Sequence, residues 1–193
     1  SSHYRFIINM YQGGLRHIVA LGSMHEVGYF EGKIDENTVT NPMSLYGVAK
    51  NALREALTIY FKDKEDVIFQ WIRGYYIVKN TVDGCSIFSK IVQAEKDGKN
   101  KFPFTTGKNK YDFVEYEEFC RQIAMVAGQE KYVGCINCCS GIPISLADRV
   151  ERFITENKFN IKLEYGVFPD RPYDSPAIWG DAEIIKKIEE LYE

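Results

Sequence analysis

The chain has 193 residues, of which 45% are apolar and 26% charged, with a formal net charge of −3. This composition is ordinary for a globular protein with one substantial core, and the acidic balance with scattered Lys and Arg argues against nucleic acid or an anionic membrane as the main partner. No apolar run approaches the roughly 18 residues that a membrane span needs, and the opening Ser-Ser-His-Tyr-Arg is not typical of a signal or transit peptide.

The cysteine content indicates a reducing compartment. Five cysteines are an odd number, and without a signal peptide they are expected to be free thiols in a cytoplasmic protein. The run Cys135-Ile-Asn-Cys138-Cys139 invites a metal interpretation. Structural zinc takes four ligands from two separated pairs, and no second Cys or His pair has suitable spacing, so no metal site is predicted.

The first elements alternate between helix and strand. Apolar residues recur at helical spacing over 3–13, and Gly13-Gly14 then ends the predicted helix. The apolar run 17–23 is typical of a buried parallel strand. Residues 24–40 are expected to form a polar loop.

The next helix carries the most informative motif. Asn41 is expected to be its N-cap and Pro42 its first helical residue, and the helix continues to about Phe61 along a broad apolar face. A strand is predicted over 67–72. This order of helices and strands predicts an α/β fold with right-handed crossovers.

The second half predicts shorter elements. Helices are expected over 86–96, 117–127, 146–157 (capped by Ser145) and 182–192, strands over 101–105, 112–116, 133–139 and 161–165, and irregular backbone over 168–181.

Tyr46 and Lys50 share one face of the predicted helix, one turn apart. A free tyrosine has a pKa of about 10, which makes it a poor base at neutral pH. A nearby ammonium favours the phenolate, which suits proton transfer to or from a sugar hydroxyl. A bare Tyr-x-x-x-Lys also occurs by chance on exposed helices, so the surrounding segments decide its meaning.

Those segments resemble the extended short-chain dehydrogenases, the NAD-dependent sugar-nucleotide epimerases, dehydratases and 4-keto reductases. The resemblance rests on six stretches in the family's order and covers essentially the whole chain: Leu21-Gly-Ser-Met-His-Glu-Val-Gly28, Asp35-Glu-Asn37, Asn41-Pro-Met-Ser-Leu-Tyr-Gly-Val-Ala-Lys50, Lys110-Tyr-Asp-Phe-Val114, Asn137 to Leu146, and Arg171-Pro-Tyr-Asp174. It implies a nucleotide-diphosphate sugar as substrate and NAD or NADP as cofactor.

The resemblance also implies roles for single residues. Tyr46 matches the general acid or base, Lys50 the residue that lowers its pKa and holds the nicotinamide ribose, and Ser23 the catalytic Ser/Thr that hydrogen-bonds the reacting sugar oxygen. Arg73-Gly-Tyr75-Tyr76 matches the strand end beside the nicotinamide, where all three named residues would bind cofactor.

Substrate-binding positions follow in the same way. Ser86 lies where the family has an Asn on the substrate helix, Lys110 where it has an Arg, and Arg171 where it binds diphosphate, a bidentate task suited to guanidinium. Family dehydratases have an Asp-Glu pair directly after the Ser/Thr, whereas this chain has Met24 and His25, both also expected to contact substrate. The resemblance therefore implies 4-epimerisation or 4-keto reduction, with hydride transfer at sugar C4.

The family begins with a strand, a glycine-rich turn and a helix N-terminus that receives the cofactor pyrophosphate, and these 193 residues do not include that segment. The expected fold is thus an incomplete Rossmann-type parallel sheet flanked by helices, with a small α+β lobe. NAD is expected to bind this chain weakly or not at all. The alternative function is a truncated, non-catalytic paralogue or fragment that keeps only a sugar-nucleotide cleft or a dimer surface.

The resemblance also suggests how the chain divides. Residues 1–80 are expected to be the remnant of the NAD-binding domain, to which 111–140 return, and 81–110 with 141–193 the sugar-nucleotide lobe. Helices 3–13 and 43–61 correspond to those that pair subunits in the family, so a homodimer is expected.

Overall fold

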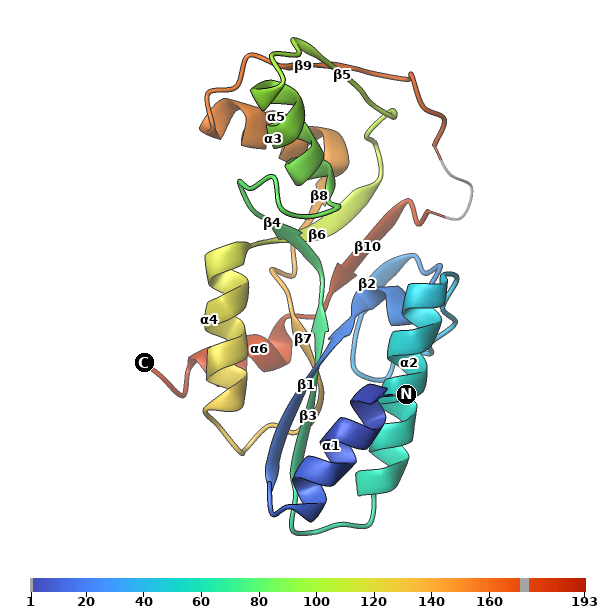
Figure 1. Ribbon diagram of the computed structural model, residues 1–193, viewed down its shortest axis with the longest axis vertical. Helices are drawn as coiled ribbons and strands as arrows, with labels where there is room; N and C mark the ends of the chain where they lie inside the picture. Colours follow the sequence, from blue (N-terminus) through green and yellow to red (C-terminus); the bar gives the residue numbers. More distant parts are fainter. Residues whose placement is uncertain (1, 171–173) are drawn as a thin grey trace.

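The computed structural model describes residues 2–170 and 174–193, and Figure 1 shows it as an elongated α/β molecule. Its lower half is built on three parallel strands in the order β1-β3-β7. These strands are β1 (His17–Ser23), β3 (Ile68–Gly74) and β7 (Gly134–Cys138). Parallel strands joined through helices are the arrangement expected from the alternation in the sequence.

Helices cover both faces of this sheet. α1 (Ser2–Gln12) and α2 (Leu45–Phe61) lie on one side, and α4 (Tyr116–Ala127) with α6 (Glu183–Glu189) on the other (Figure 1). A compact apolar cluster joins the first pair to the sheet, formed by Ile8, Ile18, Ala20, Leu57, Phe61 and Trp71. On the predicted apolar faces, Leu57 and Phe61 are buried in this cluster, whereas Phe6, Met10 and Leu45 are exposed.

A second, mixed sheet connects the lower half to the top of the molecule. Its strands run in the order β2-β10-β6-β4, and β8 pairs antiparallel with β6. They are β2 (Gly32–Ile34), β4 (Tyr76–Val78), β6 (Lys110–Glu115), β8 (Pro143–Ser145) and β10 (Ala177–Gly180). The larger apolar core continues from the lower half through this sheet.

The upper lobe consists of α3 (Ile87–Lys96), α5 (Leu146–Glu156) and the parallel pair β5 (Lys101–Pro103) and β9 (Lys162–Glu164). Ser86 and Ser145 cap the two helices, each accepting a hydrogen bond from the backbone N–H three residues on. Both helices lie where the sequence predicts them. Aromatic rings in edge-to-face contact, including Phe88 against Phe153 at 5.1 Å, pack between the helices.

The prediction for the start of α2 was wrong. Ser44 is the N-cap, with its side chain accepting the Gly47 N–H at 3.1 Å, and the helix begins at Leu45. Asn41 instead donates its N–H to the Val27 carbonyl at 3.0 Å, which holds the Asn41-Pro42 segment against the preceding loop. Ser44 lies closer to the apolar run than Asn41 does, and its side chain caps the helix.

Two segments predicted as irregular contain strands. The loop 24–40 includes a short 3-10 turn, η1 (Met24–Glu26), and β2, while 168–181 includes β10. Both strands are short, and β10 is placed by its neighbours because it pairs with β2 on one side and β6 on the other. Such pairing depends on distant residues and leaves little local signal.

The division of the chain into a cofactor part and a substrate lobe stays a prediction. The predicted sugar-nucleotide lobe, 81–110 with 141–193, includes α6. In the structure α6 packs against α4 and β7, so this helix lies with the three-stranded sheet.

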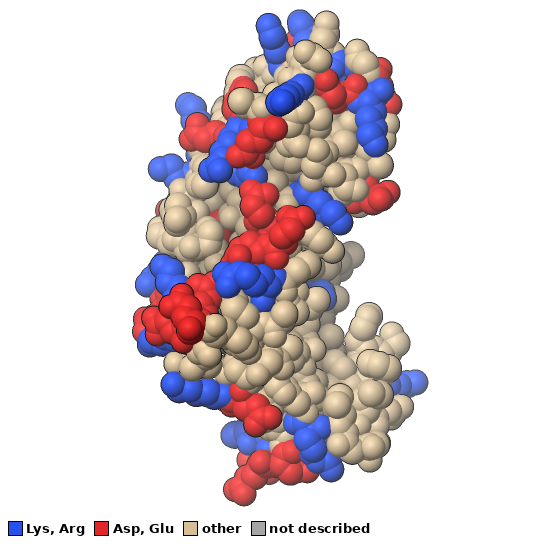
Figure 2. Space-filling model, turned by 90° about the vertical axis from the view of Figure 1, so that its left-hand side faces the viewer, with Lys and Arg blue, Asp and Glu red and all other residues tan. Residues whose placement is uncertain are grey.

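The surface mixes charges of both signs. Figure 2 shows Lys and Arg side chains interspersed with Asp and Glu on the face that carries α4, with no extended patch of one sign. Within residues 2–170 and 174–193, no helix has the length and apolarity to cross a membrane.

Candidate active site

Ser23, Tyr46 and Lys50 come together at the carboxyl end of β1. Ser23 ends that strand, η1 follows, and the start of α2 packs directly on η1. The contact is backbone to backbone, because a Cβ atom at Gly47 would lie 2.3 Å from the His25 carbonyl oxygen. Only glycine permits this approach, so Gly47 brings the helix that carries Tyr46 and Lys50 against the segment that carries Ser23.

Both the backbone N–H and the side chain of Ser23 make hydrogen bonds that fix its position. Its backbone N–H donates to Glu26 Oε1 at 2.7 Å, and its Oγ accepts the His25 N–H at 3.3 Å. The Ser23 side chain also accepts the Glu26 backbone N–H, which together with the bond from the Ser23 N–H to the Glu26 side chain forms a capping box at η1. Only 8% of Ser23 is exposed.

Glu26 is fully buried and is the centre of a polar network that the sequence analysis missed. Its carboxylate accepts from Trp71 Nε1 at 3.1 Å and lies 3.6 Å from Arg54 Nε and 3.8 Å from Arg73 Nε. Burial raises the pKa of Glu26, and the Ser23 amide and both arginines oppose that shift. The Ser-x-x-Glu spacing of a capping box was the signal available in the sequence.

Tyr46 and Lys50 lie as their spacing predicts. The Tyr46 ring is 52% exposed, and Lys50 Nζ lies 5.9 Å from its centroid. Lys50 Nζ also donates to the Leu21 carbonyl at 2.7 Å, which ties the helix to β1. The structure thus places the Lys50 ammonium beside the Tyr46 ring, near the end of β1.

The three residues expected beside the nicotinamide have different surroundings. Arg73 is buried and donates to the Asp35 carbonyl at 3.0 Å in addition to its pairing with Glu26. Tyr75 is also buried, with its hydroxyl donating to Asn137 Oδ1 at 3.2 Å, and burial raises its pKa strongly. Tyr76 lies along the open cleft, with its ring against the Tyr111 ring at 4.8 Å.

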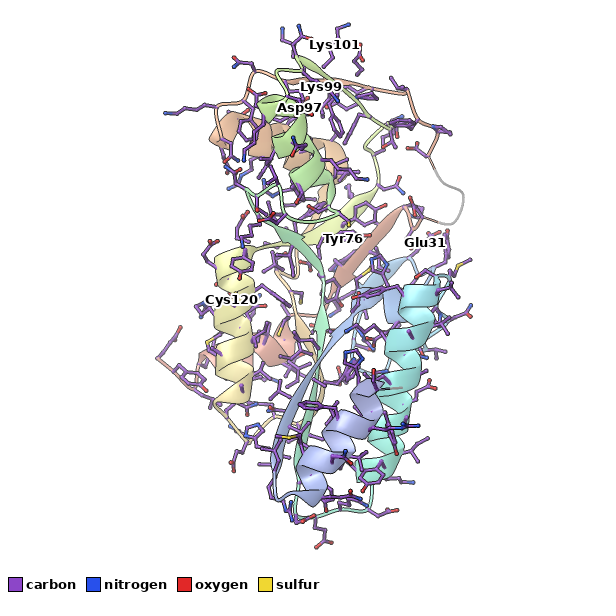
Figure 3. The ribbon with its side chains drawn as sticks, viewed as in Figure 1. Glu31, Tyr76, Asp97, Lys99, Lys101 and Cys120 are labelled. Atoms are coloured by element: carbon purple, nitrogen blue, oxygen red, sulfur yellow. The ribbon has the colours of Figure 1, made fainter. Side chains whose placement is uncertain are left out.

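Two adjoining cavities form the cleft. The lower cavity, about 350 Å³, lies between η1, the start of α2 and β10, and the upper cavity, about 600 Å³, extends under α3 and α5. They share one wall of four side chains, His25, Tyr76, Tyr111 and Asp174. Figure 3 labels Tyr76 where the second sheet passes between the lower half and the upper lobe.

The substrate-side predictions separate into two groups. Met24 and His25 line the lower cavity, and Ser86 lines the upper cavity while also capping α3. Lys110 is exposed on β6 and belongs to the lining of neither cavity. Arg171 lies outside the described residues.

His25 lies between two tyrosines. Its ring is 6.0 Å from that of Tyr46 and 5.8 Å from that of Tyr76, both edge to face. Desolvation by the surrounding protein lowers the pKa of His25, and the Asp174 carboxylate opposes this with a smaller effect. The imidazole is therefore largely neutral at neutral pH.

No metal centre is found in the part of the chain that the structure describes, where no three His, Cys, Asp or Glu side chains gather as ligands. All five cysteines are free, with Cys138 and Cys139 buried, and burial raises the pKa of Cys138 to about 12. Such thiols stay protonated at neutral pH, which makes them poor metal ligands and poor nucleophiles.

Fold and site together define an α/β protein of the short-chain dehydrogenase type, with Ser, Tyr and Lys at the carboxyl end of an edge strand of the parallel sheet. Comparison with known proteins makes this specific: residues 5–138 match the NAD dependent epimerase/dehydratase family. The chain belongs to that family.

The chain is also similar to individual members. It is 44% identical over 179 residues to the dTDP-6-deoxy-L-talose 4-dehydrogenase (NAD(+)) of Aggregatibacter actinomycetemcomitans, covering 92% of this chain and 66% of that protein. The curated relative is therefore about half as long again as the stretch it shares with this chain.

Solved structures share the fold at lower identity. A UDP-N-acetylglucosamine 4-epimerase from Methanobrevibacter ruminantium M1, in complex with UDP-N-acetylmuramic acid, superposes with a TM-score of 0.81 at 17% identity over 95% of this chain and 60% of its own. MoeE5, in complex with UDP-glucuronic acid and NAD, gives 0.78 at 20% identity over 96% and 62%. This chain thus spans about three fifths of each structure.

Proposed function

We propose that this chain carries the catalytic and sugar-binding part of an NAD(P)-dependent enzyme that acts at C4 of a nucleotide-diphosphate sugar, as a 4-keto reductase or a 4-epimerase. The observation that carries the proposal is that Tyr46 lines the lower cavity with Lys50 Nζ 5.9 Å from its ring centroid, on a helix whose start packs on the turn η1 that Ser23 caps. The similarity to a 4-dehydrogenase favours the reductase over the epimerase.

In the proposed reaction Tyr46 gives a proton to the sugar O4 during reduction, or takes it during oxidation. Ser23, held by Glu26, hydrogen-bonds the same oxygen as charge develops on it. Lys50 lies beside the Tyr46 ring and ties the helix to β1 through the Leu21 carbonyl. NAD or NADP, when bound, supplies or accepts the hydride at C4.

The described residues fit the nicotinamide end of such a cofactor only in part. Tyr46 and Lys50 present a hydroxyl and an ammonium beside the cleft, as a ribose would require. The Arg73 guanidinium pairs with Glu26 and donates a hydrogen bond to the Asp35 carbonyl. We therefore assign Arg73 a structural role and not a role in cofactor binding.

Turnover tests the proposal directly. The 193-residue chain is mixed with a thymidine or uridine diphosphate 4-keto sugar and NADH or NADPH, and the nicotinamide absorbance is followed. Tyr46→Phe should lower the rate by about 10²–10⁴-fold because it removes the acid-base group. Tyr60→Phe is the matched control, since Tyr60 lies on the same helix and packs on Tyr4 and Phe61 away from the cleft. Nucleotide-sugar binding without turnover would favour the non-catalytic alternative.

We also propose a homodimer through α1 and α2. Both helices carry large apolar side chains that are exposed in the single chain, with Phe6 65%, Met10 43% and Ile59 74% exposed. A second copy would remove this surface from water. Sedimentation velocity should give a dimer, and the double variant Phe6→Glu/Ile59→Glu a monomer; a native monomer at micromolar concentration would contradict the proposal.

A further inference from the structure

His25 is a titratable side chain in the cleft to which the proposed reaction gives no task. It is the middle residue of η1, and it lines both the lower and the upper cavity. The residue is exposed to the open cleft. An imidazole at the junction of the two cavities is therefore accessible both to a bound sugar and to solvent.

The position of His25 relative to Tyr46 is fixed by the backbone. The His25 N–H donates to Ser23 Oγ at 3.3 Å, which ties residue 25 to the end of β1. On its other side the His25 carbonyl lies against Gly47, where a Cβ atom would come within 2.3 Å of the oxygen. Gly47 follows Tyr46 directly. The His25 and Tyr46 rings therefore line the same cavity, edge to face, with 6.0 Å between their centroids.

A 4-keto sugar has a second reactive position besides C4. Its carbonyl acidifies the hydrogens on C3 and C5, because the electron pair left by removal of the proton is delocalised onto O4. In the proposed function Tyr46 and Ser23 hydrogen-bond O4, and the same bonds stabilise the charge of an enolate. Enolisation needs, in addition, a base beside C3 or C5, each of which is one bond from C4.

His25 has the properties of that base. Desolvation lowers its pKa, so the imidazole is largely neutral at neutral pH and carries one nitrogen lone pair that accepts a proton. An imidazole is also a better base near pH 7 than a carboxylate, whose ordinary pKa is about 4. Asp174 lines the same two cavities and is for that reason the weaker candidate.

We propose that His25 is the acid–base residue of a further activity, the enolisation of a bound nucleotide-linked 4-keto sugar at a carbon next to C4. This inference rests on the proposed function, which places O4 at Tyr46. An imidazole nitrogen takes the proton from C3 or C5, the C–H electron pair forms a carbon–carbon double bond, and the carbonyl pair moves to O4, which Tyr46 protonates. In the reverse step the imidazolium returns a proton to the carbon and O4 returns one to Tyr46.

The step needs no hydride and no nicotinamide, because the sugar is neither oxidised nor reduced overall. The imidazolium exchanges its proton with water in the open cleft, so each cycle replaces the carbon-bound hydrogen by one from solvent. Return of the proton to the same face keeps the configuration of the carbon. A single imidazole therefore predicts hydrogen exchange with retention, and epimerisation only where a second acid serves the opposite face.

Proton NMR in deuterium oxide tests the activity without cofactor. The native chain is mixed with excess thymidine diphosphate 4-keto-6-deoxyglucose, and the loss of the H3 and H5 signals is compared with the same solution without protein. At least one of the two signals should disappear faster with the chain. Thymidine diphosphate 6-deoxyglucose, which has a hydroxyl at C4, should keep both signals because no carbonyl acidifies the hydrogens. Calorimetric titration measures the binding of both sugars.

His25→Gln should slow the exchange at saturating 4-keto sugar by about 10²–10⁴-fold, the range for loss of a general base. His17→Gln is the matched control and should leave the exchange rate unchanged. His17 begins β1, at the end of the strand opposite Ser23, and its ring hydrogen-bonds Gln70 Oε1 at 2.9 Å. Asp174→Asn should slow the exchange much less than His25→Gln.

The outcomes separate this activity from the proposed function. If the 4-keto sugar binds but exchanges no faster than without protein, the inference is wrong and the proposed function survives. The inference is also wrong if His17→Gln slows the exchange as much as His25→Gln, or if Asp174→Asn removes the exchange and His25→Gln does not. If neither sugar binds, the proposed function fails for this chain and the inference fails with it.

Discussion

The region around Glu26 below Ser23, here called the floor of the cleft, and the upper wall formed by α3 and α5 are stabilised by different kinds of interaction. Below Ser23, a single buried carboxylate, Glu26, contacts side chains from α2 and β3 and the backbone of β1. Above, α3 and α5 are positioned by serine caps and by edge-to-face aromatic contacts such as that between Phe88 and Phe153. The floor therefore depends on one charge, whereas the upper wall depends on many small, separable contributions.

The largest expected effect tests the floor. Glu26→Ala should lower the free energy of unfolding by about 3–5 kcal/mol, because it leaves the buried Arg73 and the mostly buried Arg54 without their carboxylate. Urea denaturation measures the change. Glu55→Ala is the matched control, since the Glu55 carboxylate lies 3.6 Å from the same Arg54 but is 53% exposed.

The control variant should lose less than about 1 kcal/mol, as exposed ion pairs do. Equal losses in the two variants would show that burial of Glu26 is not what makes the floor stable. A loss below about 1 kcal/mol for Glu26→Ala would show that the carboxylate does not hold the two arginines in solution.

The same contrast explains how much could be predicted from the sequence. The caps Ser86 and Ser145 and the helices behind them follow local rules, and the sequence places both helices correctly. The cap of α2 was misplaced by three residues, because Asn41-Pro42 satisfies the same local rules as Ser44 and only the bond from Asn41 to Val27 decides between them.

The floor could largely not be predicted from the sequence, because the contacts around Glu26 join residues that lie far apart in the chain. Glu26 lies in a polar stretch and is expected to face solvent until Trp71 and Arg73, more than forty residues later, are placed beside it. In the same way, Arg73 was assigned to the cofactor from its position at a strand end. Its burial and its partner are properties of the assembled sheet.

A smaller effect tests the upper wall. Ser86→Ala and Ser145→Ala each remove a hydroxyl that accepts a backbone N–H at the start of a helix, so each should lower the free energy of unfolding by about 1 kcal/mol. Of the two serines, Ser86 alone lines the upper cavity. Denaturation and nucleotide-sugar titration of both variants therefore separate capping from substrate contact.

If Ser86 contacts substrate, its alanine variant loses nucleotide-sugar affinity and the Ser145 variant does not. Equal affinities in the two variants would leave Ser86 with a capping role only and would contradict its assignment to the substrate site.

The smallest expected effect lies where floor and wall meet, at His25. Its folded-state pKa is lowered by desolvation, so folding favours the neutral ring; this contribution to stability is present above the ordinary histidine pKa and is lost as pH falls through the folded one. Asp174 raises the pKa of His25, and Asp174→Asn should therefore lower it further, which NMR titration of the imidazole measures directly. Asp170→Asn, which removes a carboxylate from the upper cavity alone, should leave the His25 titration unchanged. If Asp174→Asn raised the pKa instead, His25 and Asp174 would not share the wall of the cleft in solution.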